Sequence, residues 1–281
     1  MTGLMHGKRG LIMGVANDHS IAWGIAKTLR QHGAELAFTY QGEALKKRVA
    51  PLAESLDSTL IMPCDVEDIA TVDAVCDELK DAWGSLDFVV HAIGFSDKNE
   101  LKGRYADTTR ANFSRTMVIS CFSFTEIARR AAALMPNGGS LLTLTYGGST
   151  RVMPNYNVMG VAKAALEASV RYLAADFGAE GIRVNAISAG PVRTLAGAGV
   201  ADARLMFNYQ KAHAPLRRTV TIEEVGGSAL YLLSDLSSGV TGEIHYVDSG
   251  YNIISMPRPD VLKAQEKAEA ASERLADPAT A

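Results

Sequence analysis

Two tyrosines and a lysine lie close together in the stretch Leu141–Lys163. Tyr146 follows an apolar run typical of a buried strand, and Lys163 comes seven residues after Tyr156. On a helix, seven residues make about two turns, so Tyr156 and Lys163 would return to nearly the same face roughly 10 Å apart. A phenol can donate a hydrogen bond, and an ammonium can bind a hydroxyl and lower the pKa of the phenol. The spacing suits two groups that hold one ligand, although a core-edge tyrosine and a solvated lysine would show it too.

The composition is that of an ordinary globular chain. It has 281 residues, of which 47% are hydrophobic and 21% charged, with a net charge of −3. No basic block is present, so a nucleic-acid partner is not expected. Cys64, Cys76 and Cys121 lack the spacing of a metal or redox motif, which favours a reducing compartment and no metal site. Neither a signal peptide nor an apolar run of about 18 residues is found, so we expect a cytoplasmic protein without a membrane span.

The chain alternates apolar strands with helical periodicity from end to end. Strands are predicted over Lys8–Gly14, Leu36–Tyr40, Thr59–Cys64, Leu86–His91, Leu141–Tyr146, Arg183–Ile187 and Gly242–Val247. Helices are predicted over Ser20–Leu29, Glu43–Leu56, Ile69–Trp83, Thr108–Leu134, Asn155–Phe177 and Ile222–Leu233. This alternation predicts an α/β fold, a doubly wound parallel sheet in a single domain. We place that domain at residues 1–256 and expect residues 257–281 to be a polar extension, helical or frayed.

Ligands of such sheets bind beyond the carboxyl ends of the strands, where the strand order reverses. Gly14 ends the first strand and permits a tight turn, Ser20 can cap the following helix, and Gly24 allows close packing. The turn is not GxGxxG, but the free amides of the helix would face a pyrophosphate. An ordinary βα turn remains the alternative.

Three later strand ends carry further candidates. Asp65 could accept a hydrogen bond from an adenine amino group, or it could cap the next helix. The small residues of His91-Ala92-Ile93-Gly94 would let a cofactor approach the backbone, while His91 itself is expected to be structural. Pro191 fixes the backbone beside a planar carboxamide such as nicotinamide, and Thr194 could reach a phosphate.

The segment Leu195–Ala201 is small, apolar and glycine-rich, and Met206 and Phe207 follow it. It is compatible with a mobile lid over an apolar substrate. It is equally compatible with a loop and helix packed on the core.

Taken together and in order, these residues resemble the bacterial NADH-dependent enoyl-[acyl-carrier-protein] reductases, a divergent branch of the short-chain dehydrogenase/reductases. The resemblance covers residues 4–256. Its most specific feature is Tyr156-x6-Lys163 preceded by Tyr146, because ordinary members of the superfamily use Tyr-x3-Lys, which this sequence lacks. The motifs that carry it are Gly14-x5-Ser20-Ile21-Ala22-x-Gly24, Asp65-Val66, His91–Gly94, Pro154–Gly160 with Lys163, and Arg183–Leu195.

The resemblance implies a Rossmann-type fold, a homotetramer, and an acyl-carrier protein that delivers the substrate of type II fatty-acid synthesis. By resemblance the catalytic residues are Tyr146, Tyr156 and Lys163. The implied cofactor residues are Gly14, Ser20, Ile21, Gln41, Asp65, Val66, Ile93, Gly94, Lys163, Val192, Arg193, Thr194, Leu195 and Ala196. The implied substrate residues are Ser96, Tyr146, Tyr156, Met159 and Met206. Departures within Asp97–Thr109 and at Ala203 leave the preferred acyl chain open.

The implied chemistry accounts for the unusual spacing. Hydride addition to C3 of a trans-2-enoyl thioester develops negative charge on the thioester oxygen, and a positioned phenol would stabilise that charge. We therefore assign Tyr156 as the oxyanion donor and Lys163 as the cofactor clamp, with the role of Tyr146 open. A carbonyl or alcohol oxidoreductase and a non-catalytic nucleotide-binding protein are the alternatives.

The choice of cofactor depends on the residues after the second strand. Gln41 follows Tyr40 without an adjacent arginine or lysine, and Glu43 would repel a 2′-phosphate. NADH is favoured over NADPH, although Lys46, Lys47 and Arg48 could curl back toward the site.

Overall fold

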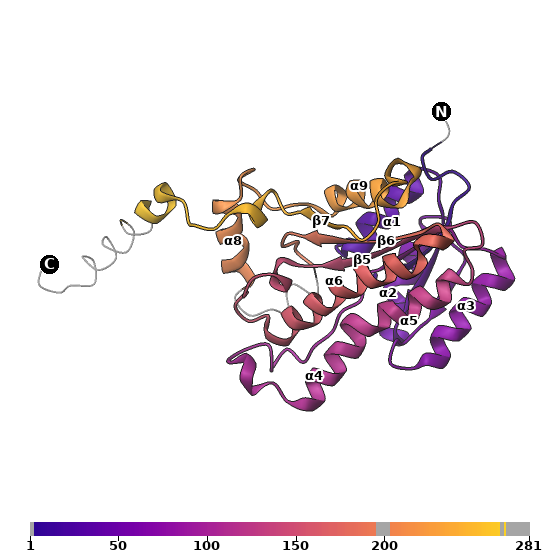
Figure 1. Ribbon diagram of the computed structural model, residues 1–281, viewed down its shortest axis with the longest axis horizontal. Helices are drawn as coiled ribbons and strands as arrows, with labels where there is room; N and C mark the ends of the chain where they lie inside the picture. Colours follow the sequence, from indigo (N-terminus) through magenta and orange to yellow (C-terminus); the bar gives the residue numbers. More distant parts are fainter. Residues whose placement is uncertain (1–2, 195–202, 265–266, 268–281) are drawn as a thin grey trace, which may run out of the picture.

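Seven parallel strands form one sheet at the centre of the molecule (Figure 1). The computed structural model describes residues 3–194, 203–264 and 267. The strand order is β3-β2-β1-β4-β5-β6-β7, and every pair of neighbours is parallel. The strands are β1 (Arg9–Met13), β2 (Glu35–Tyr40), β3 (Ile61–Pro63), β4 (Phe88–His91), β5 (Gly139–Thr145), β6 (Ile182–Ala189) and β7 (Ile244–Val247). The predicted doubly wound sheet is confirmed.

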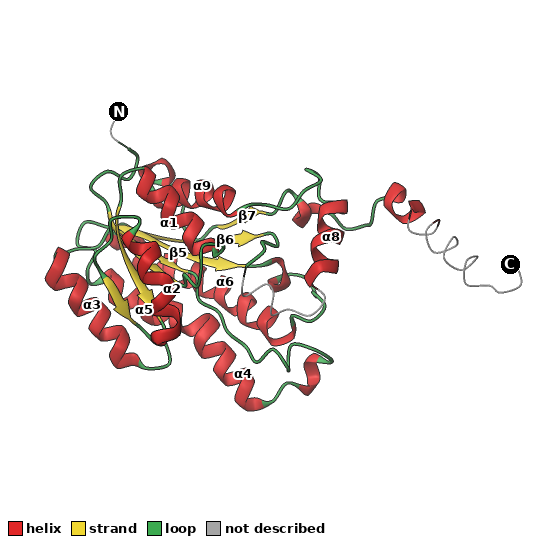
Figure 2. Cartoon of the chain, turned by 180° about the vertical axis from the view of Figure 1, so that it is seen from behind, coloured by secondary structure: helices red, strands yellow, loops and turns green. Residues whose placement is uncertain are grey.

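Helices cover both faces of the sheet, and each face has its own apolar core (Figure 2). One core joins the sheet to α1 (Ile21–Gln31), α2 (Gly42–Glu54) and α9 (Ile222–Leu233). The other joins it to α3 (Ile69–Trp83), α5 (Ser123–Ala132) and α6 (Asn157–Phe177). Because both faces are buried, the central strands are mainly apolar and do not alternate regularly with polar residues.

The order of the strands reverses between β1 and β4. From β1 the chain builds outward through β2 and β3, then returns to add β4 on the other side of β1. The loops that leave β1 and β4 therefore diverge and open a crevice at the carboxyl ends of these strands.

The predicted helix Thr108–Leu134 is interrupted in the structure. It consists of α4 (Arg110–Met117), a π-helical turn η2 (Val118–Phe122) and α5. Thr109 caps α4, since its hydroxyl accepts a hydrogen bond from the Asn112 amide at 3.2 Å. Hydrophobic periodicity does not reveal such an insertion, because the helix continues on both sides of it.

Two features lie outside the two layers. Helix α8 (Ala203–His213) lies beyond the carboxyl ends of β6 and β7, where the Gln210 side chain donates to the Asp248 carbonyl at 3.2 Å. Residues 259–264 are helical and lead away from the sheet (Figure 1).

Within the described residues, no helix is both long enough and apolar enough to span a membrane.

Candidate functional site

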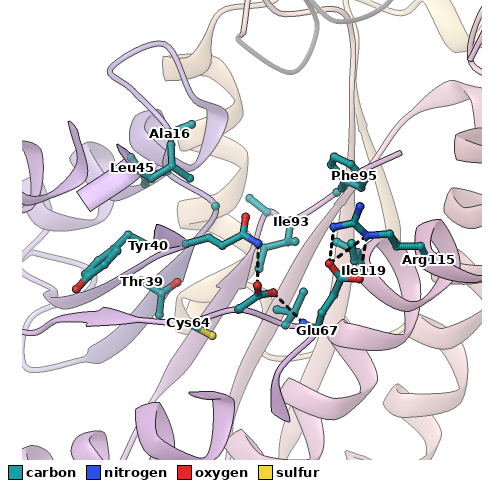
Figure 3. Close-up of a pocket in the computed structure, with 17 residues that line it drawn as sticks. Ala16, Thr39, Tyr40, Leu45, Cys64, Glu67, Ile93, Phe95, Arg115 and Ile119 are labelled. Atoms are coloured by element: carbon teal, nitrogen blue, oxygen red, sulfur yellow. Dashed lines mark hydrogen bonds and ion pairs between the residues drawn. The ribbon is translucent and has the colours of Figure 1, made fainter. Parts of the chain in front are cut away.

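A cavity of about 240 Å³ opens at the point where β1 and β4 diverge (Figure 3). It runs from the turn after β1, past the ends of β2 and β3, to the loop after β4. Six residues expected to bind a cofactor line it: Gly14, Gln41, Asp65, Val66, Ile93 and Gly94. The structure thus brings together residues from four strand ends.

Gly14 shows why the turn after β1 requires glycine. Its φ is +97°, and a Cβ at this position would lie 2.1 Å from the Ala92 carbonyl oxygen. No other residue fits, because both the backbone conformation and the space are restricted. The close approach leaves a smooth backbone floor between β1 and β4, the kind of surface that a dinucleotide can lie against.

Ser20 and Ile21 begin α1, but Ser20 does not cap it as expected. Its hydroxyl accepts hydrogen bonds from the amides of Ala16 and Asn17, at 3.0 and 3.1 Å, and not from an amide of the helix. The side chain therefore fixes the loop that precedes the helix. The first amides of α1 receive no side-chain cap and can accept an anionic group.

Asp65 lines the cavity after β3 and is not a helix cap. Its carboxylate accepts hydrogen bonds from the Gln41 side chain at 2.9 Å and from the Glu67 amide at 3.0 Å. Asp68 caps α3 instead, accepting from the Ala70 amide at 3.1 Å. Gln41 and Asp65 thus form a polar pair between the ends of β2 and β3.

Lys163 is buried on α6 with its ammonium held against the sheet. Nζ donates to the Leu144 carbonyl at 2.9 Å and lies 3.7 Å from where a Cβ of Gly94 would stand. The lysine therefore reaches the floor of the same crevice. Burial lowers its pKa to about 8, so the group stays mostly cationic at neutral pH.

Glu167 is a buried neighbour of Lys163 on α6 that was not predicted from the sequence. Its carboxylate accepts a 2.6 Å hydrogen bond from the Thr145 hydroxyl, and its charge raises the pKa of Lys163 against the effect of burial. The spacing of four residues from Lys163 on one helix was a signal that could have found it.

Tyr146 and Tyr156 pack edge to face, and neither phenol is ionised at neutral pH. Burial raises the pKa of Tyr146 to about 12, and burial also raises the pKa of Tyr156, with further contributions from Tyr146 and Glu167. The expectation that Lys163 lowers the pKa of Tyr156 is therefore wrong, because loss of solvent outweighs the distant ammonium. Both tyrosines remain hydrogen-bond donors.

The backbone around Tyr156 holds the ring in place. Helix α6 begins at Asn157 and not at Asn155 as predicted, because the positive φ of Asn155, +59°, is not helical; Asn157, the first residue of the helix, also has a positive φ of +36°. Such conformations are strained for residues other than glycine. The ring of Tyr156 then packs on Gly148, where a Cβ would come within 2.5 Å of it.

His91 is completely buried at the end of β4 and does not face the crevice. Its ring nitrogens lie 3.2 Å from the Thr143 hydroxyl and 2.9 Å from the Ser123 hydroxyl. Burial lowers its pKa to about 3, so it stays neutral. These contacts give it the structural role expected from the sequence.

Ser96 lies in the loop after β4, and Met159 lies on α6 beside the Ser120 side chain. The Ser120 hydroxyl lies 3.6 Å from the Met159 sulfur and hydrogen-bonds both the amide and the carbonyl of Phe95, each at 2.9 Å. The Thr116 hydroxyl donates to Ser96 at 2.9 Å. Ser120, which fixes this loop from η2, was not identified from the sequence.

The remaining predicted residues follow β6. Val192 and Arg193 line a separate hollow with His19 and Phe207, and the Thr194 amide bonds the Val192 carbonyl at 2.8 Å. Met206 is half-buried on α8. Leu195, Ala196 and the rest of the predicted lid, through Ala201, lie outside the described residues.

Comparisons with known proteins point to one family. The model of the family described as Enoyl-(Acyl carrier protein) reductase matches residues 14–252. The protein named enoyl-[acyl-carrier-protein] reductase [NADH] 2 of Rhizobium meliloti is 77% identical over 266 residues, 95% of this chain and 99% of that protein. The FabI enoyl-[acyl-carrier-protein] reductase [NADH] of Rickettsia felis is 56% identical over 90% of this chain and 97% of its own length.

Solved structures agree with the sequence comparisons. The crystal structure of FabI from Candidatus Liberibacter asiaticus has a TM-score of 0.90 at 62% identity, covering 92% of this chain and 100% of that one. The enoyl-(acyl-carrier-protein) reductase of Anaplasma phagocytophilum, solved in complex with NAD, has a TM-score of 0.89 at 60% identity, over 92% and 98% of the two chains.

Proposed function

Because this chain belongs to the enoyl-[acyl-carrier-protein] reductase family, we propose that Tyr156 is the oxyanion donor of its NADH-dependent reaction in fatty-acid synthesis. The bound cofactor supplies a hydride to C3 of a trans-2-enoyl thioester. Negative charge then develops on the thioester oxygen, where a phenol that remains protonated can donate a hydrogen bond. The raised pKa of Tyr156 keeps that proton in place. The hydrogen bond from Tyr156 is thus stronger in the transition state than in the bound substrate. This difference is what lowers the barrier.

Lys163 acts as the cofactor clamp in this proposal. Its ammonium has three donors, and the bond to Leu144 uses one of them. The others are available to the ribose hydroxyls of a nicotinamide nucleotide that lies along Gly94. The observation that carries the proposal is that a buried cation and two protonated phenols are placed on elements that adjoin the carboxyl end of β5.

The surroundings of the cavity fit NADH. Gly14 supplies a backbone floor, Gln41 and Asp65 supply polar groups for adenosine, and the uncapped start of α1 suits a pyrophosphate. Lys46 does not curl into the site, since it pairs with Glu43 at 3.7 Å and lies over the Tyr40 ring. The residues directly after β2, Gln41 to Leu45, include no lysine or arginine, and this favours NADH over NADPH.

The substrate assigned here is an enoyl chain carried by acyl-carrier protein. Ser96, Met159 and Met206 are the side chains proposed to contact it, together with the two tyrosines. Ser96 lines an open hollow that shares Phe95 with the cofactor cavity. The acyl thioester can therefore approach the nicotinamide from the side of the loop after β4.

A homotetramer is proposed from an exposed apolar face. Phe113 of α4, Val118 and Phe122 of η2, and Val161 and Tyr172 of α6 are all large hydrophobic side chains with substantial exposure. Helices α4 and α6 lie side by side (Figure 1), and η2 also contacts α6. Large exposed apolar side chains on adjoining elements are typical of a subunit interface. A cytoplasmic location is proposed because the three cysteines are free, which favours a reducing compartment. The domain boundary at residue 256 stays a prediction.

The decisive experiment is an assay of the full chain with 2-butenoyl- and 2-dodecenoyl-thioesters, using NADH and NADPH in parallel. We expect NADH consumption with both enoyl substrates and slower consumption of NADPH. Turnover of ketones without turnover of enoyl thioesters would indicate a carbonyl reductase. Cofactor binding without turnover of any substrate would indicate a non-catalytic nucleotide-binding protein.

A further inference from the structure

A cluster of three residues, Glu67, Phe95 and Arg115, lines the cofactor cavity on the side away from Tyr40 (Figure 3). Arg115 of α4 donates to the carboxylate of Glu67 through Nε, at 2.9 and 3.1 Å, and through Nη2, at 2.7 Å. The Arg115 guanidinium carbon lies 4.6 Å from the centre of the Phe95 ring. The guanidinium is thus held at its edge by a carboxylate and on one face by an aromatic ring.

The cluster extends a chain of hydrogen bonds around the mouth of the cavity. Gln41 donates to Asp65, Asp65 accepts from the Glu67 amide, and Glu67 accepts from Arg115. This chain links the end of β2 to α4 across the switch point. Nη1 of Arg115 makes no hydrogen bond to any other residue in the part of the chain that the structure describes.

Charge also singles out Arg115. It is the only basic residue among the described residues that line this cavity, where Asp65 and Glu67 are both acidic. Without it, two carboxylates would face a ligand that already carries two phosphates. Yet the pair adds little stability, since the side chains of Arg115 and Glu67 are 52% and 33% exposed. Its geometry is therefore better explained by a ligand than by folding.

Resting on the function proposed above, we propose that Arg115 is a positioning residue for the adenosine half of the cofactor. Glu67 and Phe95 hold the guanidinium flat, and Arg115 lines the cavity from α4. A flat, delocalised cation stacks well on a purine, and a lysine cannot replace it in that respect.

The proposal is tested with three variants: Arg115→Met, Arg115→Lys and Glu67→Gln. Arg110→Met serves as the charge control, because Arg110 is exposed at the start of α4. NADH and ADP-ribose binding are measured by fluorescence and calorimetry on the apo protein, together with its melting temperature. Arg115→Met is expected to weaken both ligands roughly three- to thirtyfold, the loss of one cation–π contact. Arg115→Lys should recover only part of this, and Glu67→Gln should lose less. A double variant that combines Glu67→Gln with Arg115→Met should match Arg115→Met alone.

Two results would overturn the proposal. One is unchanged binding of NADH and ADP-ribose by Arg115→Met. The other is a drop in melting temperature that accompanies the loss of affinity, or an equal loss in Arg110→Met, because either would indicate a structural or general charge effect. Binding of ADP-ribose does not depend on turnover, so the result is independent of whether the enoyl assay succeeds.

At saturating NADH, kcat of Arg115→Met should stay near that of the unaltered chain.

Discussion

Tyr146 and Tyr156 meet edge to face, with ring centroids 5.2 Å apart and ring planes at 75°. The first lies at the end of β5 and the second immediately before α6. Each ring therefore limits the movement of the other, and the two rings come from different elements. Edge-to-face pairs of this kind are worth about 0.5–1.5 kcal/mol beyond the area that they bury.

The first prediction separates the roles of Tyr156 and Lys163. Tyr156→Phe removes the proposed oxyanion donor, so kcat should fall by about a hundredfold to a thousandfold while NADH affinity changes little. Lys163→Met removes the clamp and should lower both kcat and NADH affinity. Steady-state kinetics and NADH fluorescence titration measure the two effects. An equal loss of NADH affinity in both variants would contradict this division.

The second prediction concerns the backbone that supports Tyr156. In Gly148→Ala the new Cβ would lie 2.5 Å from the Tyr156 ring, so the ring must shift and kcat should fall. Gly147→Ala is a matched control, since a Cβ there meets nothing within 4 Å. Both variants should fold, which circular dichroism will check. Equal activity of the two variants would show that the ring position does not matter.

The third prediction uses the pKa of Lys163, which burial lowers to about 8 from an ordinary value of 10.5. As the pH rises through about 8 the ammonium is lost, so NADH affinity should weaken by up to about tenfold per pH unit. In Lys163→Met this dependence should be absent.

Stability should respond to the same group with the opposite sign. Between about pH 8 and pH 10.5 the unfolded chain binds more protons at Lys163 than the folded one, so this group makes stability rise with pH. Urea unfolding of the apo protein and of Lys163→Met over this range measures the difference. A steeper rise in the variant would contradict the assignment.

The fourth prediction concerns His91, whose pKa burial lowers from an ordinary 6.5 to about 3. Below pH 6.5 the unfolded chain binds a proton that the folded chain does not. As the pH falls below that value, stability should therefore decrease by about 1.4 kcal/mol per pH unit from this residue alone. His91→Gln keeps a donor and an acceptor but does not titrate, so its loss of stability between neutral and mildly acidic pH should be smaller. Urea unfolding at several pH values provides the comparison.

Much of the fold was predictable because local patterns agree with the tertiary structure. Helix α3 begins and ends at the predicted residues Ile69 and Trp83, because apolar periodicity is sustained and Gly84 follows it. The start of α6 was not predictable, since the positive φ values at Asn155 and Asn157 depend on the contacts of the surrounding loop. The site residues at the ends of the strands could be named because parallel strands must meet at one edge.

What the sequence could not reveal are pairings between distant segments. Glu67 and Arg115 are separated by 48 residues, and each alone resembles a solvated charge. The burial of Tyr156 was also hidden, and burial raises the pKa of its phenol where a lowered pKa was expected. Periodicity reports which face of a helix is apolar, but it does not report which groups meet across the crevice.

The π-helical turn Val118–Phe122 limits which segments can be exchanged when chimeras of related chains are made. It places Ser120 where one hydroxyl holds both the amide and the carbonyl of Phe95. Shortening the turn by one residue would restore regular α-helical winding and remove the bulge that carries Ser120. A grafted loop after β4 would then lose its anchor, so any chimera should carry that loop and the widened turn as a single module.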